Sequence, residues 1–295
     1  MAAWEINMKS CISLYSYWKL VKTGEFTHFQ AIDKTKELGL DAVEIQVFDE
    51  NVPDGKTMAE YVKELTDYAR SKELEVPIFT VASNMYCKDP EAELNRLCEM
   101  VDIAANCGIP MMRHDVTYSF LGDEPSKSPK KIIEFVAPYI RRLADYAESK
   151  GVKTCSENHG RLMQDSYRME ELFYQVDHKN YGLLCDIGNF GGADEDCAEA
   201  VSKLLPHICF VHAKDAFKRN GMTFDPGRGY NRTRGGHYRR ATIFGHGDVP
   251  TYQILAAIKQ SGYDGYVSLE FEGIEDTLMA IEIGSENLKR MLSAF

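Results

Sequence analysis

Eight short runs of apolar and β-branched residues alternate with amphipathic segments from one end of the chain to the other. This strict alternation is typical of a parallel α/β fold in which a helix follows each strand. The predicted strands span residues 8–15, 42–48, 76–83, 109–116, 152–158, 181–189, 207–215 and 265–273. We expect them to close into a (β/α)8 TIM barrel, because an open doubly wound sheet seldom needs eight such units. Neither a GxGxxG nor a GxxxxGK[ST] motif is present.

Several predicted helices have recognisable ends. Thr27 and Gln30 have the spacing of a capping box at a helix start, and Gly39 would end that helix. Asp89–Pro90 and Ser128–Pro129 combine an N-cap residue with a first-turn proline, which is a common helix start. Further helices are predicted at about residues 57–72, 166–176, 194–205, 251–261 and 275–295. No linker or low-complexity segment interrupts this order, so we expect one domain over residues 1–295.

Composition excludes several classes of protein. The net charge of -11 would repel phosphate backbones, so we expect no nucleic-acid partner. No run approaches the roughly 18 apolar residues needed to span a membrane, and the first residues do not resemble a secretion signal. The 8 cysteines are scattered without a CxxC pair, which favours buried free thiols in a reducing compartment over disulfides. The predicted location is therefore the cytoplasm.

Four consecutive predicted strands end in ionisable residues: Glu157, Asp186, His212 and Glu270. One acidic residue at a strand end is usually a solvated carboxylate or a helix N-cap, but four in succession are difficult to explain in that way. In a parallel barrel the strand ends meet at one mouth, where active sites lie. Three carboxylates gathered there would repel one another unless a cation lay among them. We therefore predict that these four residues bind one divalent ion.

The predicted ligands are three carboxylates and one imidazole, a set that suits a hard to borderline divalent ion. Mn²⁺ is the ion that we expect, with Mg²⁺, Co²⁺ and Zn²⁺ as alternatives. Other polar residues near the strand ends are predicted to contact a substrate. They are Glu44, Arg113, His114, His159, Asn189, Lys214 and His246. Strand alternation allows only one or two residues of Arg113-His114-Asp115 to point inward. His114 is the preferred extra acid, base or substrate contact there, and the alternative is a structural histidine.

The segment 214–247 is long and rich in arginine and glycine. Its arginines are Arg219, Arg228, Arg232, Arg234, Arg239 and Arg240. One interpretation is a mobile lid or subunit contact that binds an anionic or large substrate. The other is a solvated loop without such a role.

Four motifs contain the predicted ligands: SENHG around Glu157, CDIGN around Asp186, VHAKD around His212, and FGHGDVPTYQILAAIKQSGYDGYVSLEFEG around Glu270. With the opening KSCISL, they resemble the sugar phosphate isomerase/epimerase superfamily. These xylose isomerase-like barrels include ketose 3-epimerases and inosose dehydratase. The resemblance implies one metal held by the four residues and proton transfer by Glu157 and Glu270. It departs from ketose 3-epimerases at Asn189, where they usually have histidine. It also departs at Lys218, where they often have arginine.

The resemblance implies a metal-dependent isomerase or epimerase that abstracts a proton next to a carbonyl of a keto-sugar or related polyol. The first alternative is a lyase or dehydratase acting on an oxidised sugar such as a 3-keto-glycoside, similar to a C-glycoside deglycosidase. A second is a phosphodiesterase of the endonuclease IV type, which needs several metals and more histidines at the mouth. A third is a metal-binding barrel without catalysis. A small carbohydrate is the expected partner, and a homo-oligomer or an accessory subunit remains open.

Overall fold

The computed structural model describes residues 8–122 and 127–295. Eight parallel strands close into a barrel, as predicted. They are β1 (Lys9–Ser13), β2 (Ala42–Gln46), β3 (Phe79–Val81), β4 (Met111–His114), β5 (Lys153–Glu157), β6 (Tyr181–Asp186), β7 (Ile208–Ala213) and β11 (Tyr266–Leu269). Each strand lies beside its neighbour in chain order, and β1 pairs with both β2 and β11, which closes the barrel.

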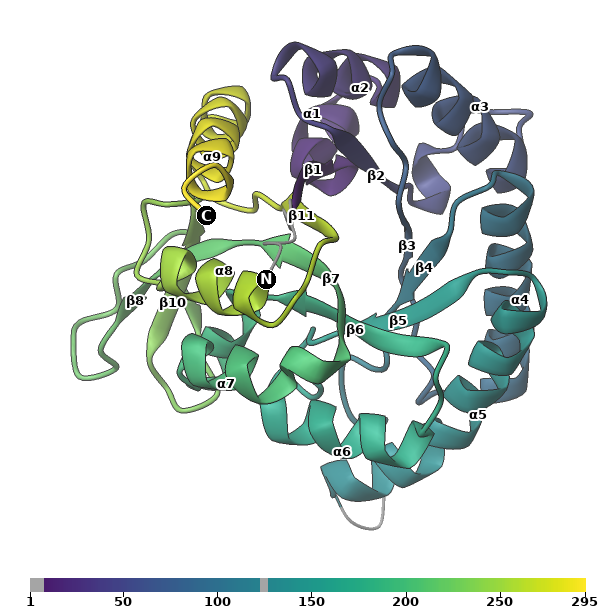
Figure 1. Ribbon diagram of the computed structural model, residues 1–295. Helices are drawn as coiled ribbons and strands as arrows, with labels where there is room; N and C mark the ends of the chain where they lie inside the picture. Colours follow the sequence, from purple (N-terminus) through teal and green to yellow (C-terminus); the bar gives the residue numbers. More distant parts are fainter. Residues whose placement is uncertain (1–7, 123–126) are drawn as a thin grey trace, which may run out of the picture.

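Helices surround this barrel (Figure 1). Those that follow the barrel strands are α2 (His28–Glu37), α3 (Met58–Ser71), α4 (Pro90–Asn106), α5 (Pro129–Ser149), α6 (Ser166–Val176), α7 (Cys197–Leu204), α8 (Thr251–Gln260) and α9 (Thr277–Leu292). Thr27 and Gln30 form both halves of the predicted capping box, and Gly39 has a φ of +66°, which favours glycine. The Asp89 side chain caps α4 ahead of Pro90. These helix starts are therefore those that the sequence predicts.

Some local predictions differ from the structure. Ser128 precedes α5, but its side chain makes no capping hydrogen bond. The helix predicted from residue 194 begins at Cys197, because the 3₁₀ helix η3 (Asn189–Ala193) precedes it and Asp196 caps it. Short elements that the sequence analysis did not predict are η1 (Leu14–Tyr17), α1 (Trp18–Thr23), η2 (Asp49–Asn51) and η4 (Leu205–His207).

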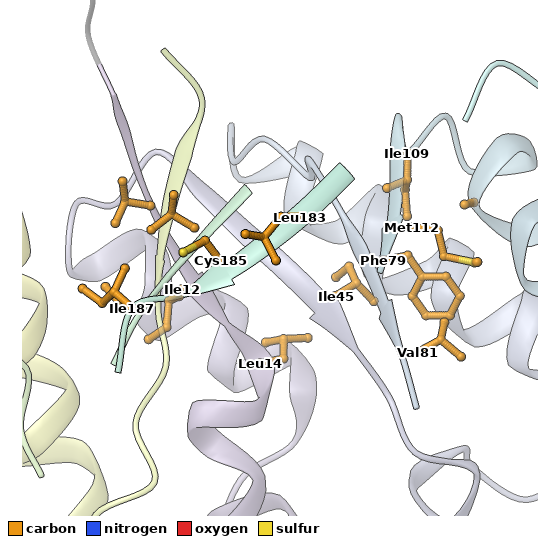
Figure 2. Packing of buried hydrophobic residues seen from close by; sticks show 14 of the residues in the cluster. Ile12, Leu14, Ile45, Phe79, Val81, Ile109, Met112, Leu183, Cys185 and Ile187 are labelled. Carbon is orange, nitrogen blue, oxygen red and sulfur yellow. The ribbon is translucent and has the colours of Figure 1, made fainter. Parts of the chain in front are cut away.

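Side chains of the barrel strands alternate between two cores. Figure 2 shows Leu183 and Cys185 of β6 in the core cluster that also contains Phe79 of β3 and residues from the surrounding helices. Leu184, between them, belongs to a separate small cluster inside the barrel with Cys155 and other strand residues. Since successive side chains on a strand point to opposite faces, the residues two positions after this inner cluster also point inward, nearer the carboxyl ends.

The segment predicted as a loop at residues 214–247 contains a three-stranded antiparallel sheet. Its strands are β8 (Asp215–Arg219), β9 (Asn231–Arg232) and β10 (Tyr238–Thr242), in the order β8-β10-β9. We call residues 214–247 the excursion; its sheet projects from one side of the barrel (Figure 1). The buried Asp215 carboxylate accepts backbone N–H groups from Ala216, Gly245, Gly247 and Val249. These bonds hold the two ends of the excursion together.

In the part of the chain that the structure describes, none of the helices has the length and apolar character that crossing a bilayer would require.

Candidate metal centre and active site

The four predicted ligands come together at the carboxyl ends of their strands. One donor atom from each of Glu157, Asp186, His212 and Glu270 lies within 4.8 Å of the other three. All four residues are buried, with exposed fractions between 0% and 7%. Donors on opposite sides of one ion lie about 4.4 Å apart when metal–oxygen bonds are about 2.2 Å. This cluster of carboxylate and imidazole groups fits a metal site.

Three buried donor atoms of this cluster make no hydrogen bond of regular geometry, although two of them are ion-paired with Lys214: Asp186 Oδ2, His212 Nδ1 and Glu270 Oε2. A buried polar atom that is left unpaired costs free energy, so such atoms are rare without a functional reason. Nδ1 of His212 lies 3.6 Å from Glu270 Oε2 and 3.9 Å from Glu157 Oε1. These three atoms therefore lie close to one another, as metal ligands would.

Neighbouring residues orient the two central donors. Glu44 accepts a hydrogen bond from Nε2 of His212 at 2.9 Å, which directs Nδ1 toward the cluster. Asp186 Oδ1 accepts backbone N–H groups from Gly188 and Asn189, which leaves Oδ2 for the cluster. The Glu44–His212 arrangement is the one that fixes ring orientation in metal centres. Glu44 was predicted as a substrate contact, but the structure buries it completely beneath His212.

Lys214 is a buried cation among these carboxylates. Its Nζ lies 3.0 Å from Asp186 Oδ2 and 2.5 Å from Glu270 Oε2. It is also 3.2 Å from Glu272 Oε2. Burial opposes the charged form, but the three carboxylates raise the pKa of Lys214 well above its usual value. The ammonium therefore balances part of the negative charge of the metal-free protein.

Glu157 and Glu270 have different surroundings. Glu157 accepts hydrogen bonds from Arg113 Nη2 at 2.5 Å and from Asn189 Nδ2 at 3.0 Å. Burial raises the pKa of Glu157 above its usual value, and Arg113 offsets this only in part. Burial acts on Glu270 in the same direction, but Lys214 and His212 hold its pKa well below the usual range. Enzymes use carboxylates with pKa values shifted apart to separate an acid from a base.

A buried network connects Glu157 to His159. Besides Glu157, Arg113 Nη2 also donates to Asp115 Oδ1 at 2.7 Å. Asp115 also accepts hydrogen bonds from His159 Nδ1 at 2.8 Å and from the Tyr118 hydroxyl at 2.5 Å. Burial lowers the pKa of His159, but the Asp115 carboxylate outweighs it and raises that pKa to about 9. His159 is therefore an imidazolium at neutral pH in the metal-free protein.

The charge of His159 predicts a specific pH dependence in the metal-free protein. Its folded pKa of about 9 exceeds the usual 6.5, so its stabilisation is fully present below pH 6.5 and lost as pH rises through 9. A proton NMR titration should give a His159 midpoint near 9. Asp115→Asn should move it toward 6.5, while Asp225→Asn, at an exposed site on the excursion, should leave it unchanged. A midpoint near 6.5 in the parent protein would show that Asp115 does not hold the proton.

A cavity of about 190 Å³ lies at the strand ends beside these groups. We call it the mouth cavity. Of the residues predicted from the sequence, Arg113, Glu157, His159, Lys214 and Glu270 line it. Sequence analysis assigned no role to six other polar or aromatic lining residues: Tyr15, Gln46, Phe48, Asp115, Tyr118 and Glu272. These residues lie in loops or on the amino-terminal strands, and no sequence motif around them indicates a functional role. Asp115 and Glu272 had a signal, because they follow Arg113 and Glu270 at alternate spacing.

The remaining predicted residues do not line the mouth cavity. His114 follows Arg113 directly and points to the opposite face of β4, where it is fully buried and stacks on Tyr181 at 6.1 Å. This geometry supports the structural alternative for His114. Asn189 is buried and contacts Glu157 instead. His246 is exposed near the end of the excursion.

Comparisons with known proteins agree with this fold. A family model described as xylose isomerase-like TIM barrel matches residues 32–291. An inosose dehydratase from Clostridium perfringens is 27% identical over 145 residues, which cover 46% of this chain and 46% of that protein. The chain spans about half the length of these curated relatives.

Two solved structures have the same fold at low sequence identity. One is the probable 3-DHS dehydratase AsbF, involved in petrobactin synthesis, from Bacillus anthracis; its TM-score is 0.74 at 17% identity, over 96% of this chain and 99% of that one. The other is the IOLI protein with a binding zinc atom; its TM-score is 0.73 at 19% identity, over 98% of this chain and 99% of that one. Because the family model covers most of the sequence, this chain belongs to the xylose isomerase-like TIM barrel family.

Proposed function

We propose that this chain is a divalent-metal-dependent enzyme that removes a proton from the carbon next to a carbonyl group of a keto-sugar or related polyol. Isomerisation or epimerisation is the proposed net reaction. One observation carries the proposal: Glu157 and Glu270 both line the mouth cavity and both belong to the cluster of metal-binding side chains. Such a pair suits proton removal at one position and proton return at another.

Glu157, Asp186, His212 and Glu270 would hold the ion. A bound divalent ion would supply charge stabilisation for neighbouring oxygen atoms of the sugar as the proton leaves. Mn²⁺ remains our choice because oxygen donors predominate in the cluster. The zinc atom in the IOLI protein supports the view that this fold accommodates a divalent ion.

The proton steps are assigned to the two glutamates. Glu270 is ionised beside Lys214, so it accepts the proton when the C–H bond breaks. The electron pair of that bond moves into the adjacent carbonyl group and gives an enediolate. Glu157, which also lines the mouth cavity, returns a proton from its protonated form. Return to the opposite face of the same carbon gives epimerisation. Return to the neighbouring carbon, with transfer of the hydroxyl proton to the former carbonyl oxygen, gives isomerisation.

A lyase or dehydratase is the second candidate, and His159 favours it. The ring lines the mouth cavity while Asp115 holds its Nδ1, so Nε2 is available to protonate a departing hydroxyl or glycosidic oxygen. The same first proton abstraction would then be followed by loss of the group on the next carbon. The dehydratase names of the Clostridium perfringens relative and the Bacillus anthracis structure also support this candidate.

The remaining alternatives have less support. An endonuclease IV-type reaction needs several metals, whereas the described residues contain one cluster of metal-binding side chains. The net charge of -11 also opposes binding of nucleic acid. The cytoplasmic location, the carbohydrate partner and an oligomeric or accessory subunit remain predictions.

Hydrogen exchange in heavy water tests the proposed function. The Mn²⁺-loaded protein would be incubated in D₂O with a panel of keto-sugars and analysed by mass spectrometry and NMR. We expect deuterium at the carbon next to the carbonyl group of an accepted sugar, even if the net reaction is elimination. Protein without metal is the control and should give no exchange. Conversion of a sugar with neither deuterium uptake nor internal transfer of hydrogen would contradict proton abstraction.

A further inference from the structure

The excursion and the barrel enclose a second cavity, of about 530 Å³, which we call the arginine cavity. Arg161 follows β5, while Arg232, Arg234 and Arg239 come from the β9–β10 hairpin of the excursion. Glu272, just after β11, lines both this cavity and the mouth cavity. The arginine cavity is therefore next to the proposed reaction site.

One of the four arginines has a structural role. Arg234 donates to Asp165 Oδ2 at 2.6 Å and to the Arg161 carbonyl at 2.7 Å. Its backbone N–H donates to the Gly192 carbonyl. These bonds fix the turn of the hairpin to the loops after β5 and β6. Arg234 was expected from the sequence to act with the other excursion arginines, but its charge is already paired.

The other three guanidinium groups have no carboxylate partner among the residues that the structure describes. Arg232 donates to the Gly236 carbonyl and to the Tyr238 hydroxyl, and its guanidinium lies 4.5 Å from the centre of the Tyr238 ring. Arg161 is exposed at the cavity edge. Glu272 is the one acidic lining residue, and its carboxylate also lies 3.2 Å from Lys214 Nζ. Three guanidinium groups thus outnumber the single carboxylate of the cavity lining, in a protein whose net charge is -11.

Arg239 borders both the arginine cavity and a neighbouring cavity that Gly188 and Asp194 also line. Its Nη2 is buried and has no hydrogen-bond partner. A Cβ atom at Gly188 would lie 3.3 Å from that Nη2, so the turn after β6 packs closely against the guanidinium. A buried N–H of a charged group that lacks an acceptor is costly, and an oxyanion is its natural partner.

We propose that the arginine cavity binds an oxyanion, a carboxylate or a phosphate, on the part of the sugar substrate that is remote from the reacting carbonyl. Guanidinium groups match both oxyanions with paired hydrogen bonds. Arg161, Arg232 and Arg239 bind this group, and Arg234 holds the hairpin in place. The inference rests on the proposed function, because the proposed function assigns the reacting end of the same sugar to Glu157 and Glu270.

Isothermal titration of the Mn²⁺-loaded protein tests this inference without turnover. The probes are D-fructose 6-phosphate and D-glucuronate, each compared with its neutral counterpart, D-fructose or D-glucose. At low salt we expect at least one acidic sugar to bind about tenfold more tightly than its counterpart, a difference of about 1.4 kcal/mol. Binding of D-fructose 6-phosphate alone assigns a phosphate group, and binding of D-glucuronate alone assigns a carboxylate.

The combined variant Arg161→Gln, Arg232→Gln and Arg239→Gln should lose this preference but keep its metal content. The matched control Arg228→Gln changes an exposed arginine of the same excursion that does not line the cavity, and should keep the preference. Equal binding of acidic and neutral sugars by the parent would overturn the inference. An unchanged preference for acidic sugars in the combined variant would also overturn it. That holds even if light scattering shows that the three substitutions dissociate an oligomer.

The two proposals can fail separately. Selective binding through the arginines without deuterium exchange would contradict the proposed function alone. Exchange on neutral sugars, together with no preference for acidic ones, would contradict the oxyanion site alone.

Discussion

Replacing Glu157 or Glu270 with glutamine is expected to lower turnover of the accepted sugar by about 10² to 10⁴-fold, the loss usual for a general acid–base group. Glutamine keeps an oxygen donor of similar size in the cluster, but it cannot accept the substrate proton or return one. Substrate binding should therefore survive better than turnover. The comparison requires kcat, the Kd of the sugar and the metal content of each variant.

Deuterium exchange provides a second readout for the same variants, and it should fall with turnover. The matched control is Glu286→Gln, at an exposed position on α9, which should keep the parental rate. If both active-site variants were metal-replete and turned over the sugar at the parental rate, the two carboxylates would be metal ligands at most. The proton-transfer assignment would then be wrong.

Asp186→Ala is expected to reduce divalent-metal affinity by at least about 10²-fold. Substitution of residues that only orient the ligands already lowers metal affinity by about 10 to 100-fold, and Asp186 is itself a proposed ligand. Asp186 contributes a buried carboxylate oxygen that lies 3.0 Å from Lys214 Nζ. Without that carboxylate, the Lys214 ammonium would have less negative charge beside it and would repel the ion more strongly. Elemental analysis after dialysis measures the effect.

A graded series makes this metal experiment sharper. Glu44→Gln keeps an acceptor for Nε2 of His212 but removes its charge, so we expect a smaller loss, of about 10 to 100-fold. The exposed Asp264→Ala is the control and should bind metal as the parent does. Parental metal content in Asp186→Ala would show that the assigned cluster is not the metal site.

The sequence was sufficient to predict the barrel and the polar cluster at its mouth. Each apolar run has the length of a strand, and parallel strands bring their carboxyl ends to one side. Period-two alternation then sends Glu157 inward with Cys155, and Asp186 inward with Leu184. Strand length and alternation depend only on residues that are close together in the chain, so they can be predicted before the fold is known.

Orientation within the site required the tertiary structure. Both Arg113 and His114 were candidates for the mouth, and the strand register decides that Arg113 reaches Glu157 while His114 stacks on Tyr181. Glu44 and His212 lie on strands that are far apart in the sequence. Closure of the barrel brings Glu44 Oε2 to 2.9 Å from His212 Nε2. No local pattern encodes contacts of this kind, because they depend on which strands become neighbours across the barrel.

The sequence by itself determined the strand–helix order, the single barrel and the four residues that gather at its mouth. The tertiary structure decided the partners of those residues and the fold of the excursion as a sheet. It also decided that Arg234 is paired while Arg161 joins Arg232 and Arg239 around a cavity. The physical reason is the range of the interactions. Strand and helix periodicity acts over a few residues, whereas charge pairing and cavity shape depend on loops that meet only after the barrel has closed.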